Sequence, residues 1–340
     1  MRIAQLAPLA ESVPPRLYGG TERVVSWLTE ELVHRGHAVT LFATGDSTTC
    51  AELAPVWPRG LRLGEPQVDP IIAQSVALEL FARRASEFDV VHCHCDWIHL
   101  PILTRLDVPF LTTLHGRLDL PGLPELVKTY PRAAFVSISE DQRRPLPSAR
   151  WAGTVYHGFP IDLLQPSFEP GQYLAFLGRL SPDKGPEVAI RIARDAGTPL
   201  RIAAKLPRED EDYFKDRLEP LIDGRHAELT GEVDENSKEG FLAGASALLF
   251  PIDWPEPFGL VMIEAMACGT PVIAFRQGSV PEVIEHGVSG FVVDDEQEAL
   301  EAVRRIHELD RTKVRQAFEQ RFTVTTMADK YLALYNDILS

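Results

Sequence analysis

The 340-residue sequence is poor in cysteine and has no long apolar run. Its four cysteines, Cys50, Cys93, Cys95 and Cys268, are too few for a disulfide framework, which favours a reducing cytoplasm. No apolar stretch approaches the ~20 residues that a membrane span needs. The opening MRIAQLAPLAESVPP lacks the charged start and apolar core of a signal peptide, so we expect a first β-strand there. A cytoplasmic protein is the resulting expectation.

Basic charge is also scarce. The chain has 34 Lys+Arg against 49 Asp+Glu, a formal net charge of −15. Residues 1–158 hold 15 basic and 17 acidic residues, whereas the remainder holds 19 and 32. A phosphate backbone would be repelled by this balance, so nucleic acid is not an expected partner. The acidic chain can still carry local basic sites.

Apolar runs alternate with helical patterns along the chain. We expect strands at 3–6, 38–42, 90–94, 110–114 and 134–138, and then at 173–177, 200–204, 227–229, 247–250 and 272–275. Helical periodicity appears at 20–35 and 187–196. The repeated β-α-β order predicts an α/β fold with two doubly wound, Rossmann-like domains and a cleft between them. We place the domains at 1–158 and 172–322, the linker at 159–171, and a tail helix at about 323–340 that packs back on the first domain.

The stretch PEPFGLVMIEAM holds Glu256 and Glu264, eight positions apart. Glu256 lies in a predicted loop, and Glu264 lies about a turn and a half into a predicted helix that follows Gly259. Carboxylates accept paired hydroxyl protons and therefore suit the diols of a sugar or a ribose. The alternative is a glycosidase acid/base pair, which sequence spacing alone does not exclude.

A second stretch, FLGRLSPDKGPEVAI, places cations after a strand. The predicted strand ends at Gly178, Arg179 and Lys184 follow, and a helix starts near Gly185. Fixed cations beside a helix N-terminus can cradle a diphosphate, although a solvated loop with surface charges is an equal alternative. Such a cradle has no place in a simple hydrolase.

Weaker signals lie in the first half. In YGGTERVV, Gly19 and Gly20 open a helix and allow close approach of an anion, or form a plain turn with Thr21 as N-cap. In DVVHCHCDWIH, His92 and His94 share one face of a strand, where zinc binding is possible by spacing. Cleft lining or packing is the favoured reading, and no metal site is expected. His115 ends another strand and is a candidate for sugar contact or proton handling.

Together these stretches resemble the GT4 glycosyltransferases, which have the GT-B fold. The resemblance covers nearly the whole chain. It is most specific in EPFGLVMIEAMACGTPVIA, the E-x7-E element of retaining GT-B enzymes, and next in FLGRLSPDKG. YGGTE, TLHG and SISE support it. Two departures are HG at His157–Gly158, where the family has NG, and RIAAKLPRED, which replaces a GxGp loop and leaves the role of Lys205 open.

The resemblance implies a role for each matching residue. Glu264 should bind the donor ribose. Glu256 should bind the donor sugar, with the backbone of Phe258, Gly259 and Leu260 near sugar and phosphate. Arg179 and Lys184 should neutralise the diphosphate, beside Gly178. Gly19 and Gly20 should approach the phosphate, His115 should lie beside the sugar, and Glu232 in LTGEV should lie where the nucleobase binds.

The implied activity is retaining transfer of a hexose-type sugar from a nucleotide-diphosphate sugar, preferably a UDP-sugar, to an acceptor hydroxyl. Side-chain cations and helix N-termini would replace a divalent metal, so no cofactor is expected. No side chain is an obvious covalent nucleophile, which favours front-face attack. The rivals are an epimerase of the same fold, a glycoside hydrolase and a non-catalytic nucleotide-sugar sensor. The expected acceptor is a small molecule, glycan or natural product, and membrane association is not favoured because a strongly basic amphipathic helix is missing from the first domain.

Overall fold

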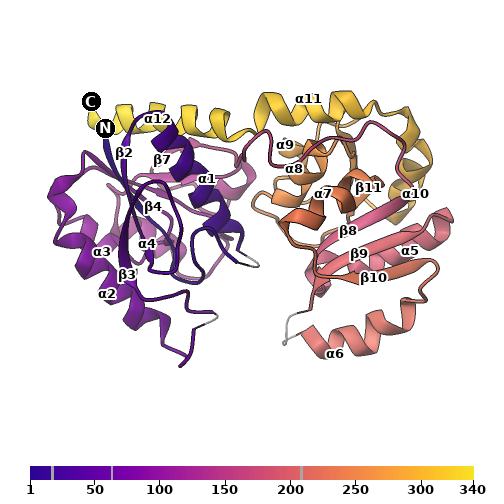
Figure 1. Cartoon of the computed structure of the whole chain (residues 1–340), viewed down its shortest axis with the longest axis horizontal. Helices are drawn as coiled ribbons and strands as arrows, with labels where there is room; N and C mark the ends of the chain where they lie inside the picture. The colour runs from indigo at the N-terminus through magenta and orange to yellow at the C-terminus, as the bar shows by residue number, and fades with distance from the viewer. Residues whose placement is uncertain (17–18, 63, 207–209) are drawn as a thin grey trace. The chain divides into compact units, whose positions relative to one another are not determined.

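The computed structural model describes residues 1–16, 19–62, 64–206 and 210–340. It divides into two compact units, which Figure 1 shows with many of their elements labelled. Unit 1 comprises Met1–Pro160 and Thr323–Ser340, and unit 2 comprises Ile161–Phe322. Residues 161–171, expected as linker, are therefore part of unit 2, where the Ser167 N–H donates to the Cys268 carbonyl at 3.0 Å. Each unit is described by itself below.

Unit 1 is built on a parallel sheet. Over the described residues it has seven strands in the order β3-β2-β1-β4-β5-β6-β7, with Ile3 opposite both Val39 and Val90. All these strands are parallel, but from β1 to β3 the chain adds strands on one side of β1 and from β4 onward it adds them on the other side. Doubly wound folds have this arrangement, and they bind ligands beyond the carboxyl ends of the strands. The strands are β1 Arg2–Leu6, β2 Ala38–Thr44, β3 Glu52–Trp57, β4 Val90–Cys93, β5 Phe110–Thr113, β6 Phe135–Ser137 and β7 Trp151–Thr154.

The helices of unit 1 include one from the far end of the chain. Helix α12, Val324–Leu339, lies against α1, Gly20–His34, in Figure 1, and Arg35 donates to Asp329 at 2.5 Å. Its Tyr331 and Tyr335 are fully buried, so the tail contributes to the unit's core. The other helices are α2 Pro70–Ala82, α3 Leu100–Leu103 and α4 Leu123–Thr129.

Unit 2 repeats the same plan. Over the described residues its parallel sheet has six strands in the order β10-β9-β8-β11-β12-β13, with the same change of side between β8 and β11. The strands are β8 Tyr173–Arg179, β9 Leu200–Lys205, β10 Ala227–Gly231, β11 Ala245–Phe250, β12 Val272–Phe275 and β13 Gly290–Val293. Its helices are α5 Pro186–Ala196, α6 Glu211–Tyr213, α7 Glu235–Ala243, α8 Leu260–Ala267, α9 Val280–Val283, α10 Glu296–Arg305 and α11 Arg311–Arg321.

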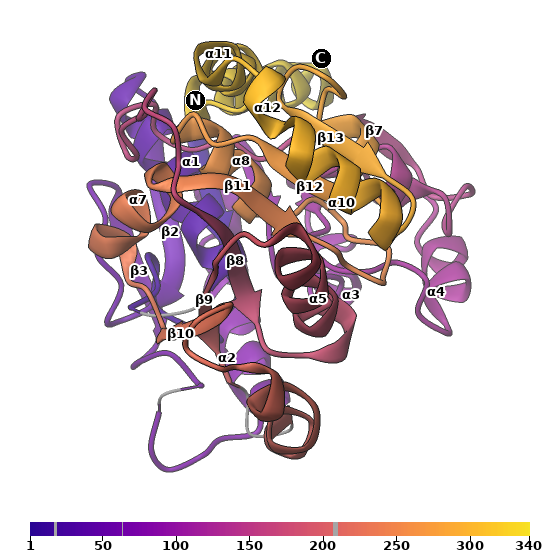
Figure 2. The same ribbon diagram turned by 90° about the vertical axis from the view of Figure 1, so that its right-hand side faces the viewer.

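The core of unit 2 explains why its helices form where they do. Helices α5 and α10 lie side by side in Figure 2 and bury Ile190, Ile192 and Val303 against strand residues such as Phe176 and Leu249. Helices α7 and α8 pack against β11. Strands with helices on both faces are buried throughout, and their sequences are therefore nearly continuous apolar runs.

The predicted doubly wound α/β fold is confirmed. Strands β3, β7 and β13 were not predicted, and each lies at an edge of its sheet. The burial of β3 is mixed and that of β7 is slight, so neither is buried along its whole length as a central strand is, whereas β13 is fully buried. In the described part of the chain, no helix combines the length and the apolar character that crossing a membrane requires.

Candidate functional site

The diphosphate candidates of unit 2 lie at the carboxyl edge of its sheet. Arg179 is the last residue of β8, one residue beyond the predicted strand end at Gly178, and lies opposite Lys205 of β9. One guanidinium nitrogen of Arg179 lies 3.8 Å from the Asp183 carboxylate. Its Nε is buried and has no hydrogen-bond partner among the described residues. Arg179 and Lys205 are thus two cations that end neighbouring strands, at the edge where α/β proteins bind ligands.

Lys184 connects this edge to the loop that carries Glu256. Its ammonium donates to Glu256 Oε2 at 2.6 Å and lies 4.2 Å from the centre of the Trp254 ring. The two loops are also joined by the Asp253 N–H, which donates to the Asp183 carbonyl at 2.9 Å. An ion pair, a cation–π contact and a backbone bond therefore fix the position of the Lys184 charge.

Gly185 is required for this contact. A Cβ at this position would lie 2.1 Å from the Pro251 carbonyl oxygen, and φ is +69°. A side chain would force the Lys184 loop away from the loop that follows β11. Glycine is thus the residue that the close approach requires.

Helices α5 and α8 both begin after a glycine, Gly185 and Gly259. A glycine N-cap has no side-chain oxygen to offer the first N–H groups of the helix, which suits them to bind an anion. Leu260 is the first residue of α8, and Phe258 is buried behind it with its carbonyl accepting from Ser279 Oγ at 3.0 Å. The predicted Phe258–Leu260 backbone therefore lies at a helix start.

Glu264 is already engaged by a cation that the sequence analysis missed. Lys238 of α7 donates to Glu264 Oε1 at 2.6 Å, and both side chains are about 10% exposed, at 11% and 10%. Asp234 caps α7 by accepting from the Ser237 N–H at 2.9 Å, which sets the start of the helix that carries Lys238. Glu232, the nucleobase candidate, is exposed and follows β10.

The two carboxylates therefore have matching environments. Glu256 accepts from Lys184 and Glu264 accepts from Lys238, in each case at 2.6 Å. A carboxylate bound to an ammonium is arranged to accept hydrogen bonds, and a general acid must instead give up a proton. The geometry favours holding a ligand over cutting a glycosidic bond.

The glycine candidates of unit 1 lie at the start of α1. Gly19 is the N-cap and Gly20 the first helical residue, so the plain alternative with Thr21 as N-cap is wrong. A Cβ on Gly19 would lie 2.8 Å from Pro15 Cβ. Glu22 is buried in the first turn, and burial, with the Glu11 carboxylate nearby, raises its pKa. Tyr18 of the same stretch lies outside the described residues, as do residues 207–209 of the loop after Lys205.

His115 lies two residues beyond β5, in a cluster of histidines. His94 Nδ1 lies 2.9 Å from His115 Nε2, and the His157 ring stacks on His115 with centroids 5.2 Å apart. Burial lowers the pKa of His115 to about 3 and also lowers the pKa values of His94 and His157, so the cluster is neutral at pH 7. His157, the departure from the family's NG, thus packs on the sugar-contact candidate.

The side chains of the His92–Cys95 run contact other side chains of unit 1. His92 bonds Tyr335 and Thr113 at 2.7 Å each, and Cys93 on the opposite side packs in an apolar cluster. Among the described residues, no group of three or more His, Cys, Asp or Glu is arranged to hold a metal ion. The favoured expectation, that this run packs or lines a site, agrees with these contacts.

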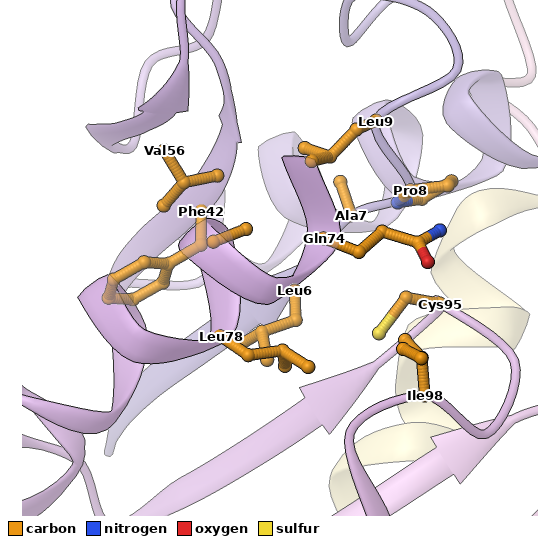
Figure 3. Close-up of a pocket in the computed structure, with 11 residues that line it drawn as sticks. Leu6, Ala7, Pro8, Leu9, Phe42, Val56, Gln74, Leu78, Cys95 and Ile98 are labelled. Atoms are coloured by element: carbon orange, nitrogen blue, oxygen red, sulfur yellow. The ribbon is translucent and has the colours of Figure 1, made fainter. Parts of the chain in front are cut away.

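Unit 1 also holds a small apolar pocket at the carboxyl edge of its sheet, with a volume of about 30 Å³ (Figure 3). Apolar side chains surround the Gln74 amide and the Cys95 thiol. On the neighbouring α2, Ile71 and Ile72 are 63% and 58% exposed. The sequence analysis predicted neither the pocket nor this exposed face, because an apolar residue in a helix is as consistent with a buried position as with an exposed one.

Two protein-family models match the chain. Residues 18–155 match Glycosyltransferase Family 4, and residues 165–322 match Glycosyl transferases group 1. The uncharacterized glycosyltransferase MJ1607 of Methanocaldococcus jannaschii is 25% identical over an alignment 345 residues long, gaps included, which covers 85% of each chain.

Solved structures agree. AviGT4, a glycosyltransferase involved in avilamycin A biosynthesis, has a TM-score of 0.74 at 26% identity and covers 99% of this chain and 98% of its own. Anabaena Alr3699/HepE, solved with UDP and glucose, has a TM-score of 0.74 at 20% identity over 99% of this chain and 100% of its own. The protein is therefore a glycosyltransferase of the GT-B class. Within that class it belongs to the GT4-type family, as the sequence analysis predicted.

Proposed function

We propose that the protein is a retaining, metal-independent transferase that moves a hexose-type sugar from a nucleotide-diphosphate sugar to an acceptor hydroxyl. The observation that carries the proposal is the fixed charge at the carboxyl edge of unit 2. Arg179 and Lys184 lie there together with the starts of α5 and α8. Breaking a sugar–phosphate bond leaves negative charge on the diphosphate, and preorganised cations and N–H groups stabilise that charge.

The carboxylates take the remaining parts of the donor. Glu264 keeps one oxygen for the ribose while the other accepts from Lys238, and Glu256 holds the sugar hydroxyls while it orients Lys184. A UDP-sugar is the preferred donor, by analogy with Anabaena Alr3699/HepE, which was solved with UDP and glucose. The acceptor hydroxyl attacks from the face that the diphosphate leaves, which retains the anomeric configuration.

Unit 1 would bind the acceptor. Its apolar pocket and the exposed Ile71 and Ile72 of α2 favour an acceptor with an apolar portion, such as a natural product, over a purely polar glycan. A bulky Ala77→Phe change narrows this pocket and should raise the acceptor KM without changing donor binding. Ala333→Phe, at an exposed position of α12, is the matched control.

The test is release of nucleoside diphosphate with and without acceptor. A thermal-shift panel of UDP-, GDP- and ADP-sugars first identifies the donor, and NMR of the product then reports its anomeric configuration. We expect acceptor-dependent release that survives EDTA. Acceptor-independent interconversion of the sugar would identify an epimerase, and donor binding without any release would identify a sensor. Loss of release in EDTA, restored by Mg²⁺ or Mn²⁺, would contradict metal independence.

A further inference from the structure

A continuous chain of hydrogen bonds in unit 1, buried except for the partly buried last link, ends at His115. His115 Nε2 bonds His94 Nδ1 at 2.9 Å, and His94 Nε2 bonds Gln5 Oε1 at 2.8 Å. Gln5 Nε2 donates to the Tyr335 hydroxyl at 3.3 Å, and Tyr335 bonds His92 Nδ1 at 2.7 Å. The chain thus joins β1, β4 and the loop after β5 to the tail helix α12.

The Gln5 amide gives this chain a direction. An amide oxygen only accepts and an amide nitrogen only donates, so His94 must carry its proton on Nε2. His94 Nδ1 is then an acceptor, which requires His115 to donate from Nε2. A neutral imidazole has one N–H, so His115 Nδ1 is left as an acceptor.

The same logic holds at the other end of the chain. Tyr335 accepts from Gln5 Nε2 and therefore donates to His92 Nδ1, which leaves His92 to donate from Nε2 to Thr113 Oγ1 at 2.7 Å. Every imidazole along the path is assigned consistently. Burial lowers the pKa values of His92 and His94, so both rings stay neutral and keep their single N–H.

His115 Nδ1 stands out at the end of the chain. It is buried and has no hydrogen-bond partner among the described residues. A buried polar atom without a partner is costly unless a water or a ligand satisfies it. As an acceptor, Nδ1 complements a hydroxyl group.

We propose that Gln5 and His94 are positioning residues that hold His115 as the Nε2–H tautomer, so that Nδ1 accepts a hydrogen bond from a hydroxyl of the transferred sugar. The HCHC run then acts through His94 without touching substrate. This inference rests on the proposed function, because it assigns the sugar hydroxyl as the partner of His115.

Nuclear magnetic resonance of protein labelled with ¹⁵N-histidine tests the tautomer directly. His115→Asn identifies the His115 signals by subtraction. We expect wild-type His115 to show a pyrrole-type Nε2 and a pyridine-type Nδ1. Gln5→Met, which removes both amide atoms at similar volume, should mix the two tautomers, and Tyr335→Phe should perturb His92 more than His115. A protonated Nδ1 in the wild type would mean that the chain runs in reverse, and would overturn the proposal.

Kinetics supply the second readout, with a matched control off the chain. Gln5→Met should lower kcat/KM for the donor about tenfold, the usual effect of one lost buried hydrogen bond. Thr112→Val likewise removes a hydrogen-bond partner from a buried histidine, because Thr112 Oγ1 bonds His99 Nε2 at 2.7 Å, but this pair lies outside the chain. It should leave kcat/KM and the His115 tautomer unchanged.

The two experiments separate the possible failures. A Gln5→Met variant with the wild-type tautomer and kcat/KM would refute the positioning role while leaving the transferase function intact. If the wild type transferred no sugar from any nucleotide donor, the proposed function would fail and the sugar partner of Nδ1 with it. The tautomer spectrum would still show whether Gln5 directs the chain.

Discussion

The two units share one strand order but place different kinds of polar residue at their ligand-binding edges. Unit 2 uses ion pairs, Lys184 with Glu256 and Lys238 with Glu264. Unit 1 uses neutral imidazoles bonded to hydroxyls and an amide, and the buried histidines of the described chain all belong to it. The comparison shows that a doubly wound sheet does not dictate the electrostatics of its edge. Under the proposed function, fixed charge suits a diphosphate and neutral acceptors suit hydroxyl groups.

The largest effect should come from breaking one ion pair of unit 2. Lys238→Met leaves the Glu264 carboxylate buried without its ammonium, which should lower the free energy of unfolding by about 3–5 kcal/mol. The double change Lys238→Met/Glu264→Gln removes both charges and should cost much less. Urea unfolding of the single and double variants measures the difference. Equal losses in the two would show that the pair is exposed enough to be replaced by water.

Removing the Arg179 guanidinium, whose buried Nε has no hydrogen-bond partner among the described residues, should slow turnover. Arg179→Ala is expected to lower kcat about 10²–10³-fold, as loss of a preorganised charge-stabilising donor does, with a smaller change in donor Kd. Arg194→Ala is the control, because Arg194 is an exposed residue of α5 that pairs with Asp195. Unchanged turnover in Arg179→Ala would contradict its role on the leaving group.

Carboxylate removal should affect nucleotide binding. Glu264→Ala is expected to weaken nucleoside diphosphate binding about tenfold or more, because a charged hydrogen bond to the ribose is lost. Glu264→Gln keeps an acceptor and should bind more tightly than the alanine variant. Isothermal titration with the nucleotide alone measures both, and identical Kd values for wild type and Glu264→Ala would exclude the ribose contact.

Acid should destabilise unit 1 through its neutral histidines. Their pKa values are lowered by burial in the folded state, to about 3 for His115, so the unfolded chain binds protons first as the pH falls below about 6.5. The free energy of unfolding is therefore highest above that pH. Below it, each such histidine lowers the free energy of unfolding by about 1.4 kcal/mol per pH unit.

Tryptophan fluorescence can isolate this effect. Trp254 is the one tryptophan of the sequence outside residues 1–160, so Trp254→Phe leaves the fluorescence signal to unit 1. Urea unfolding from pH 7 to pH 5 then gives the slope, which His94→Asn should reduce and His226→Gln, an exposed histidine of unit 2, should not. If the free energy of unfolding of the Trp254→Phe variant did not change between pH 7 and pH 5, the histidines of unit 1 would not be buried in their neutral form.

The smallest effect should come from one hydroxyl of the tail helix. Tyr331→Phe removes the bond between Tyr331 and Thr113 Oγ1, 3.0 Å long, and should cost about 1 kcal/mol, because Thr113 keeps its bond to His92. Tyr130→Phe, at a half-buried position at the end of α4, is the control. If Tyr331→Phe lowered the free energy of unfolding as much as Lys238→Met, the hydrogen bonds of the histidine network would depend on one another rather than contribute singly.

Sequence patterns predicted much of the fold but only part of the site. The central strands were readable because each is a buried apolar run. Arg179, Lys184 and Gly185 were readable because they lie in the short stretch between a predicted strand and a predicted helix. Lys238 was missed because it lies 26 residues before Glu264, on a different helix. Gln5 was missed because a single amide in an apolar strand has no distinctive spacing, and its partners are far away along the chain.

The sequence by itself determined the doubly wound architecture, the two series of strands and the family, since these follow from local periodicity and from short stretches such as EPFGLVMIEAMACG. Tertiary structure alone decided which cation each carboxylate holds and how the histidines share their protons. The physical reason is that ion pairs and hydrogen-bond direction depend on distances between side chains of different elements, and those distances exist only after the strands and helices have packed.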